Sequence, residues 1–132
     1  MKKPDFPIKT VDELETLARS LRWQWFERLV AFVFEQNDFK VDHNKVLVFD
    51  KSTKRQYDVI AERFEKIWLV ECKKQKNLNI NEAIKKHLER CEMYHKKTGK
   101  TVVPLIVTMN QEAQAEIPIM PLLKLNTFIN EY

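Results

Sequence analysis

The most constraining stretch of this sequence is residues 66–73, Lys-Ile-Trp-Leu-Val-Glu-Cys-Lys. Side chains of a β-strand alternate between two faces. Here both faces are apolar over the first half, which is typical of a strand buried on both sides. Glu71 and Lys73 then place charge on one of these faces, which is costly unless the charge is paired, binds a metal or opens to a cleft. The stretch therefore predicts a central strand that ends at a polar site.

A second strand is predicted at Tyr57 to Ala61, and a short charged turn would join the two into an antiparallel hairpin. The register that pairs apolar residues with each other places Asp58 opposite Glu71 and Gln56 opposite Lys73. Directly opposed residues have Cα atoms about 4.5 to 5.5 Å apart. Two carboxylates this close repel each other, and a divalent cation between them would relieve the repulsion.

This pattern, an Asp on one strand and Glu-x-Lys late in the next, resembles the PD-(D/E)XK nuclease superfamily. The Mrr-like and archaeal Holliday-junction-resolvase-like branches are the most similar. Glu27, in a Phe-Glu pair of the preceding helix, and Gln75, two residues after the Lys, belong to the same resemblance, which covers roughly Trp23 to Met109. The chain departs from the pattern with Tyr57 at the position of the name-giving Pro and Cys72 between Glu and Lys, neither of which must carry chemistry.

The resemblance implies a DNA endonuclease that depends on Mg²⁺, with Mn²⁺ as a substitute ion. Asp58 and Glu71 would bind the metal, which polarises the phosphate and lowers the pKa of water. By resemblance, the backbone carbonyl of Cys72 would be a third metal ligand. Lys73 would orient the attacking water or stabilise charge in the transition state. The supporting residues would be Glu27 and Gln75.

Glu27 has two interpretations. It lies at the edge of a narrow polar strip on a helix that is otherwise apolar. On the helical wheel alone it is a boundary carboxylate at the surface. The resemblance instead makes it an extra metal ligand, or a group that positions the metal, which projects toward Asp58.

Periodicity and turn signals predict an α/β fold. A hairpin followed by a strand-helix-strand crossover gives a mixed sheet with helices on both faces, a restriction-endonuclease-like architecture. The first three strands would form an antiparallel meander. A capping box at Thr10 to Glu13 predicts an early helix, and Asn79 and Gly99 would bound another. The expected helices are 21–36, 80–98, a turn or two at 111–116 and a short one from 126; the expected strands are 46–49, 57–61, 66–73, 101–109 and 117–120.

The composition fits one domain over residues 1–132, with a loosely held lead at residues 1–9. Two cysteines suit free thiols in a reducing cytoplasm. A single glycine argues against the glycine-rich loops that bind nucleotide cofactors. The sequence shows no apolar run long enough to span a membrane.

The net charge of +4 permits nucleic-acid binding without demanding it. Basic residues cluster after the predicted site, and they would track a phosphate backbone. Acidic residues interleave with them, which equally suits an ordinary solvated helix face. The candidate nucleic-acid-binding residues are Lys74, Lys76, Lys85 and Lys86.

His87, Cys91 and His95 recur at four-residue steps, so a metal site on that helix is geometrically possible. Cys91 lies in the apolar stripe of the helix, which favours a packing role. The tryptophans at positions 23, 25 and 68 are likewise better explained as core residues than as base-stacking platforms.

The sequence therefore predicts a metal-dependent DNA endonuclease that acts as a homodimer, since cutting both strands needs two sites. The alternative is a nucleic-acid-binding module that keeps the fold without cutting. A third possibility is a role without DNA, for which no salt-sensitive DNA affinity is expected. The opposed carboxylates favour the enzyme.

Overall fold

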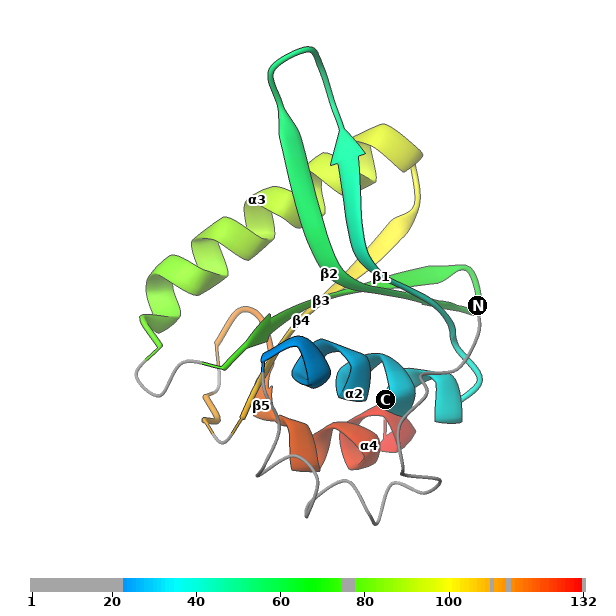
Figure 1. Cartoon of the computed structure of the whole chain (residues 1–132), viewed down its shortest axis with the longest axis vertical. Coiled ribbons are helices and arrows are strands. Elements are labelled where there is room, and N and C mark those ends of the chain that lie inside the picture. Colours follow the sequence, from blue (N-terminus) through cyan, green and yellow to red (C-terminus); the bar gives the residue numbers. More distant parts are fainter. Residues whose placement is uncertain (1–22, 75–77, 110, 114, 132) are drawn as a thin grey trace.

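We describe residues 23–74, 78–109, 111–113 and 115–131 of a computed structural model of the chain (Figure 1). The elements in order are α2 (Trp23–Gln36), β1 (Lys40–Val48), β2 (Lys54–Arg63), β3 (Lys66–Lys73), α3 (Ile80–Thr98), β4 (Thr101–Thr108), β5 (Ile119–Pro121) and α4 (Leu122–Glu131). The predicted capping box, the predicted flexible lead, Gln75 and Lys76 lie outside the described residues. Within the described residues, no helix is both long and apolar enough to cross a bilayer.

The five strands form one mixed sheet in the order β1-β2-β3-β4-β5. The first three strands are antiparallel, and α3 connects β3 to β4 in parallel. α2 and α4 pack on one face of the sheet and α3 on the other (Figure 1). The predicted mixed sheet with helices on both faces is therefore confirmed.

β3 is buried on both faces, as its sequence predicts. Trp68 and Val70 belong to the core beneath α2 and α4, while Ile67 and Leu69 belong to the core beneath α3. The Trp68 ring contacts that of Phe34 edge-on, with ring centroids 5.7 Å apart. Trp68 is therefore a core residue. Because β3 is packed on both faces, the positions of Glu71 and Lys73 at its end are fixed.

The predicted hairpin register is confirmed over its apolar part. Ile60 pairs with Leu69, and the turn residues Phe64 and Glu65 both have positive φ, 54° and 63°. Two consecutive left-handed residues match the twist of a tight hairpin, although the sequence offers neither Gly nor Asn there.

The boundaries of α3 are also confirmed. The Asn79 side chain accepts a hydrogen bond from the Glu82 N–H at 3.1 Å, which caps the first turn. Gly99 adopts φ 73°, and its N–H donates to the His95 carbonyl at 2.7 Å. These local signals set the length of the helix that faces the site.

Four predictions near the sheet edges were wrong. β1 spans Lys40–Val48 instead of 46–49, because an exposed edge strand needs no apolar pattern on its open side. Residues 111–113 and 115–116 are not helical, and Ala113 forms an antiparallel bridge to Ile119. β5 is shifted to Ile119–Pro121, and α4 starts at Leu122 rather than at 126, directly after it.

The alternation of faces along β2 breaks at Asp58. Tyr57 packs under α3, where its hydroxyl donates to the Arg90 carbonyl at 2.8 Å. Val59, two residues later, belongs instead to the core beneath α2. On β1, Asn44 has φ 53° between the pairs that join β1 to these two residues. Strict alternation would keep Tyr57 and Val59 on one face, so this local twist is what frees Asp58 from either core.

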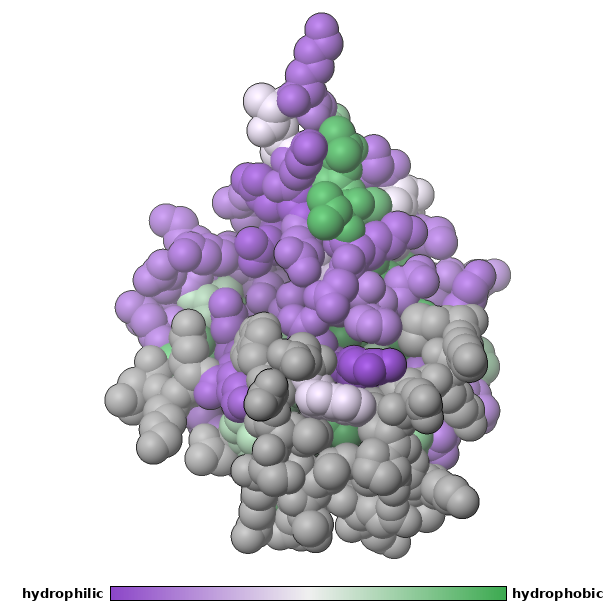
Figure 2. Space-filling view, viewed as in Figure 1, coloured by the Kyte–Doolittle hydropathy of each residue, from purple (hydrophilic) through white to green (hydrophobic). Residues whose placement is uncertain are grey.

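The β1–β2 hairpin projects beyond the rest of the sheet (Figure 1). Val46 and Val48 on β1 are 54% and 51% exposed. Figure 2 shows hydrophobic colour high on the molecule, within a mainly hydrophilic surface. Lys97 of α3 supports the hairpin by donating to the Val48 carbonyl at 3.0 Å.

Replacing Gly99 with Ala should lower the free energy of unfolding by about 1–2 kcal/mol, because φ 73° is costly for a residue with a Cβ. The added Cβ would meet no atom within 4 Å, so the cost comes from the backbone alone. Urea denaturation measures the loss. Gly99→Asn is the control and should lose less, since Asn adopts this conformation more readily; an equal loss would contradict the backbone explanation.

Candidate active site

Three carboxylates from three elements converge at one end of the sheet. Glu27 comes from α2, Asp58 from β2 and Glu71 from β3. They border a cavity of about 290 Å³. Its lining residues are Glu27, Gln56, Asp58, Glu71, Cys72, Lys73, Lys74 and Arg90. The structure thus brings together the predicted catalytic and metal-binding residues that it describes.

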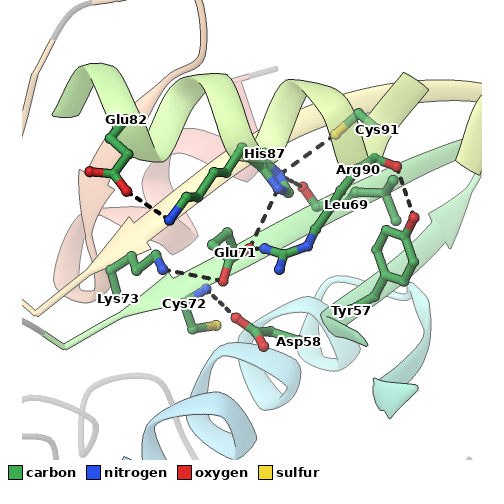
Figure 3. A network of polar contacts seen from close by, with 11 residues as sticks. Tyr57, Asp58, Leu69, Glu71, Cys72, Lys73, Glu82, His87, Arg90 and Cys91 are labelled. Atoms are coloured by element: carbon green, nitrogen blue, oxygen red, sulfur yellow. Dashed lines mark hydrogen bonds and ion pairs between the residues drawn. The ribbon is translucent and has the colours of Figure 1, made fainter. Parts of the chain in front are cut away.

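Glu71 lies among three basic side chains (Figure 3). Arg90 Nη1 of α3 is 3.1 Å from Glu71 Oε2, and Lys73 Nζ is 3.7 Å from Oε1. His87 Nδ1 is also 3.7 Å from Oε2. The Glu71 side chain is 12% exposed. The charge at the end of β3 is therefore both paired and open to a cavity.

Asp58 closes the gap where β2 and β3 separate. Its Oδ2 accepts a hydrogen bond from the Cys72 backbone N–H at 2.8 Å (Figure 3). The ladder between the strands ends at Val59 and Val70, so the prediction that Asp58 pairs with Glu71 through the backbone was wrong. The two side chains still meet and share a hydrogen bond, because the face switch turns Asp58 into the cavity.

Glu27 is 6% exposed, so its interpretation as a surface carboxylate was wrong. Its side chain is hydrogen-bonded to Asn44 and to Asp58. The carboxylates thus form a chain from α2 to β3. The helical wheel missed this because the strip it read as solvent faces the cavity.

Burial and crowding change the acidity of the cluster. Burial, and then the nearby charge of Glu71, raise the pKa of Asp58 to about 8. Burial also raises the pKa of Glu27. The pKa of the fully buried Cys72 thiol is raised well above its usual value, again chiefly by burial. Asp58 therefore holds a proton that offsets part of the negative charge.

Sequence reasoning missed Asn44 and underrated Arg90 and His87. Asn44 forms a hydrogen bond with Glu27. It lies on the polar edge strand β1, whose sequence pattern gave no indication of a site. Arg90 was one of many basic residues, and what distinguishes it is its place three residues after His87, at the margin of the buried stripe of α3. A charge at such a margin is a usable signal when a cluster of opposite charge faces it.

The predicted nucleic-acid-binding residues have different surroundings. Lys74 lines the cavity, and Lys85 is exposed on α3. Lys86 pairs with Glu82 at 2.7 Å and borders a separate hollow next to Lys73. The acidic residues of α3 thus form ion pairs with some of its lysines, as with Glu82 and Lys86, whereas Lys74 lies at the carboxylate cavity.

The helix carrying His87, Cys91 and His95 gives no metal site. His87 Nε2 donates to the Leu69 carbonyl at 2.8 Å, since a carbonyl can only accept. Burial lowers the pKa of His87, which favours its neutral form. His95 Nδ1 faces the Lys100 carbonyl at 2.7 Å instead of the other two side chains. These residues pack and cap the structure.

The carboxylate cluster fits a hard divalent cation by its donor chemistry. Its oxygens are the ligands that Mg²⁺ prefers. Burial, and after it the charge of Glu71, raises the pKa of Asp58, so a cation would relieve part of this cost. In the part of the chain that the structure describes, no group of three or more His, Cys, Asp or Glu side chains is arranged so that it could hold a metal ion by itself. Mg²⁺ needs none, because it keeps several waters and uses few protein ligands.

A family model described as restriction endonuclease (Mrr_cat) matches residues 18–123, which include all of these site residues. The chain belongs to this restriction endonuclease family. The predicted resemblance is therefore confirmed.

Similar proteins agree with the fold. An uncharacterized protein of Archaeoglobus fulgidus is 27% identical over 117 residues, which cover 83% of this chain and 90% of that protein. The small subunit of a heterodimeric restriction endonuclease is similar in structure, with a TM-score of 0.57 at 14% identity, over 92% of this chain and 75% of that one. A Vibrio cholerae protein gives a TM-score of 0.64 at 14% identity over 83% of this chain, which spans only 33% of that protein.

The raised pKa of Asp58 predicts how the stability of the metal-free protein changes with pH. A carboxyl that is neutral in the folded state up to about pH 8, but ionises near pH 4 when unfolded, makes stability fall as pH rises between these values. Asp58→Asn keeps an acceptor for Cys72 and removes the titration. It should raise Tm at pH 8 by at least about 4 °C and change it little at pH 4.

Tm is measured by thermal denaturation in EDTA, so that no metal is bound. Asp50→Asn is the matched control. Asp50 is exposed, and its backbone hydrogen bond from Ser52 lowers its pKa, so its removal should not stabilise the protein at pH 8. A Tm difference for Asp58→Asn that is the same at both pH values would contradict the assigned cause.

Proposed function

We propose that this member of the restriction endonuclease family is a divalent-cation-dependent DNA endonuclease that hydrolyses phosphodiester bonds. The observation that carries the proposal is the convergence of Glu27, Asp58 and Glu71 on one cavity, with Lys73 beside them. Membership of the family supports the reaction class. The cation and the DNA substrate are parts of the proposal.

Asp58 and Glu71 would hold the cation, with Glu27 and the backbone carbonyl of Cys72 completing the protein ligands. Mg²⁺ is the proposed ion and Mn²⁺ its substitute. When bound, the ion would polarise the phosphate and lower the pKa of water. The hydrogen bond from the Cys72 N–H fixes Asp58 before any ion arrives.

Lys73 is placed to act on the reacting groups. It shares the face of Glu71, and its side chain is 28% exposed, so its ammonium reaches both the carboxylate and the cavity. Such a group would orient the attacking water or stabilise charge that develops on the phosphate oxygens. Gln56 and Lys74 line the same cavity, where they would contact the DNA strand.

A DNA strand carries one charge per phosphate, so a basic rim supplies affinity without reading sequence. Lys74 at the cavity and Lys85 and Lys86 on α3 are the proposed contacts, together with Lys76. The net charge of +4 agrees with a polyanionic partner. We also propose that Gln75 positions the phosphate or the attacking water.

Cutting both strands of a duplex takes two sites, so we propose that the chain acts as a homodimer. One structural relative is a subunit of a heterodimeric enzyme, which makes a different second subunit the competing arrangement. Sedimentation of the purified chain, alone and with DNA, distinguishes the two.

The substitution Lys73→Ala should lower the rate of DNA cleavage in Mg²⁺ about 100-fold or more, as expected when a group that stabilises the transition state is removed. Supercoiled plasmid and branched duplexes are the substrates, and EDTA should abolish cleavage. Lys96→Ala is the control, because Lys96 is exposed and pairs only with Glu92 at 3.0 Å among the contacts resolved for it. An uncleaved substrate with salt-sensitive binding would instead support a module that binds without cutting.

Lys74→Gln should reduce the salt dependence of duplex binding, lowering the log–log slope by about 1 for one lost phosphate contact. Fluorescence anisotropy over a salt series gives the slope. Lys124→Gln is the control, since Lys124 pairs with Glu112 at 2.9 Å on α4, away from the cavity lining. Equal slopes for all three proteins would remove Lys74 from the proposed interface.

A further inference from the structure

Arg90 is the basic residue that lies nearest to the Glu71 carboxylate. Its Nη1 is 3.1 Å from Glu71 Oε2, the shortest of the three basic contacts made by this carboxylate (Figure 3). The guanidinium also lines the cavity, and the side chain is 30% exposed. It therefore borders both the carboxylate and the space proposed for DNA.

The other two basic groups cannot replace it. Lys73 contacts the other oxygen of Glu71, at 3.7 Å. His87 Nδ1 lies 3.7 Å from Oε2, farther than Arg90 Nη1, and the buried ring is held by the bond from its Nε2 to the Leu69 carbonyl. Arg90 is thus the principal counter-charge of Oε2.

The backbone of Arg90 is fixed, but its side chain is only partly held. Tyr57 donates its hydroxyl proton to the Arg90 carbonyl at 2.8 Å, and Tyr57 directly precedes Asp58. In contrast, the buried Nε of Arg90 has no hydrogen-bond partner within the described residues. The anchor of the Arg90 backbone is therefore separate from the contact between its guanidinium and Glu71.

We propose that Arg90 is a displaceable counter-ion. It holds Glu71 while the site is free of metal, and it turns to a DNA phosphate in the same cavity when a divalent cation takes Glu71. A guanidinium suits both partners, because its fork binds carboxylate and phosphate alike. The inference rests on the proposed function and goes beyond it, since it couples the binding of two ligands through one residue.

Such an exchange has two thermodynamic consequences. The ion pair competes with the cation, so removing Arg90 should tighten metal binding in the absence of DNA. The released guanidinium favours phosphate, so metal and DNA should each tighten the binding of the other, and by the same factor. If Arg90 acted only through long-range electrostatic repulsion of the cation, it would not make metal and DNA binding depend on each other.

Calorimetric titration of Mg²⁺ into the metal-free chain tests the first consequence. Arg90→Gln should bind Mg²⁺ about fivefold or more tightly than the natural chain. Arg55→Gln is the matched control, because Arg55 pairs with the exposed Glu89 at a similar 3.2 Å but lies outside the cavity lining. Equal or weaker binding by Arg90→Gln would overturn the proposal.

The second consequence is tested with a short duplex in a Lys73→Ala background, which suppresses cleavage. The gain in Mg²⁺ affinity that the duplex confers should be several-fold smaller when Arg90→Gln is added, and unchanged when Arg55→Gln is added. An undiminished gain would show that the guanidinium does not transfer to phosphate, and would overturn that part of the proposal.

Thermal denaturation confirms that each variant is folded. If Arg90→Gln does not fold, Arg90→Lys replaces it, and the loss of the planar fork should tighten Mg²⁺ binding by about twofold or more; no change would overturn the proposal. Failure of the natural chain to bind Mg²⁺ or to cut DNA contradicts the proposed function. Binding by the natural chain without a gain in the Arg90 variants contradicts the Arg90 exchange alone.

Discussion

The site depends on one hydrogen bond at the point where two strands part. Along most of β2 and β3, backbone groups satisfy each other and apolar side chains fill both faces. At Cys72 the ladder has ended, and the Asp58 carboxylate accepts the N–H that would otherwise be unpaired and buried. Because a buried backbone donor without a partner is costly, the fold itself holds this carboxylate at the cavity.

Several carboxylates surround this hydrogen bond. The helices on the two faces of the sheet change the local charge in opposite directions. α2 contributes Glu27, a further carboxylate whose pKa is raised by burial, whereas α3 contributes Arg90, whose positive charge pairs with Glu71. The Tyr57 hydroxyl joins α3 to β2 one residue before Asp58, so the backbone of Arg90 is held close to the carboxylates. The site is thus assembled by both layers of the protein, although its signature residues come from one hairpin.

Local signals predicted the parts of the fold that local physics decides. The apolar pattern of β3 and the two caps of α3 act over a few residues, and both were read correctly. β1 was mostly missed, because its partner is on one side only and its sequence is polar. The segment at 111–116 was assigned to a helix because its bridge to Ile119 is a tertiary contact that no short pattern reveals.

The same division applies to the site. The spacing of Glu71 and Lys73 along one face was predicted, since strand alternation is a local property. The face switch at Asp58 was not predicted, because it depends on Tyr57 packing under α3 and on Asn44 across the hairpin. The burial of Glu27 followed only from the placement of α2 against the sheet.

The separation of the strands has a consequence for anyone who would graft this site onto another protein. Copying the hairpin with its Asp and its Glu-x-Lys would transfer the letters but not the geometry. A regular ladder in the recipient would pair the Cys72 N–H with backbone and leave the Asp58 side chain aimed at the wrong layer. The transferable unit is the forked pair of strands together with the tyrosine that twists it.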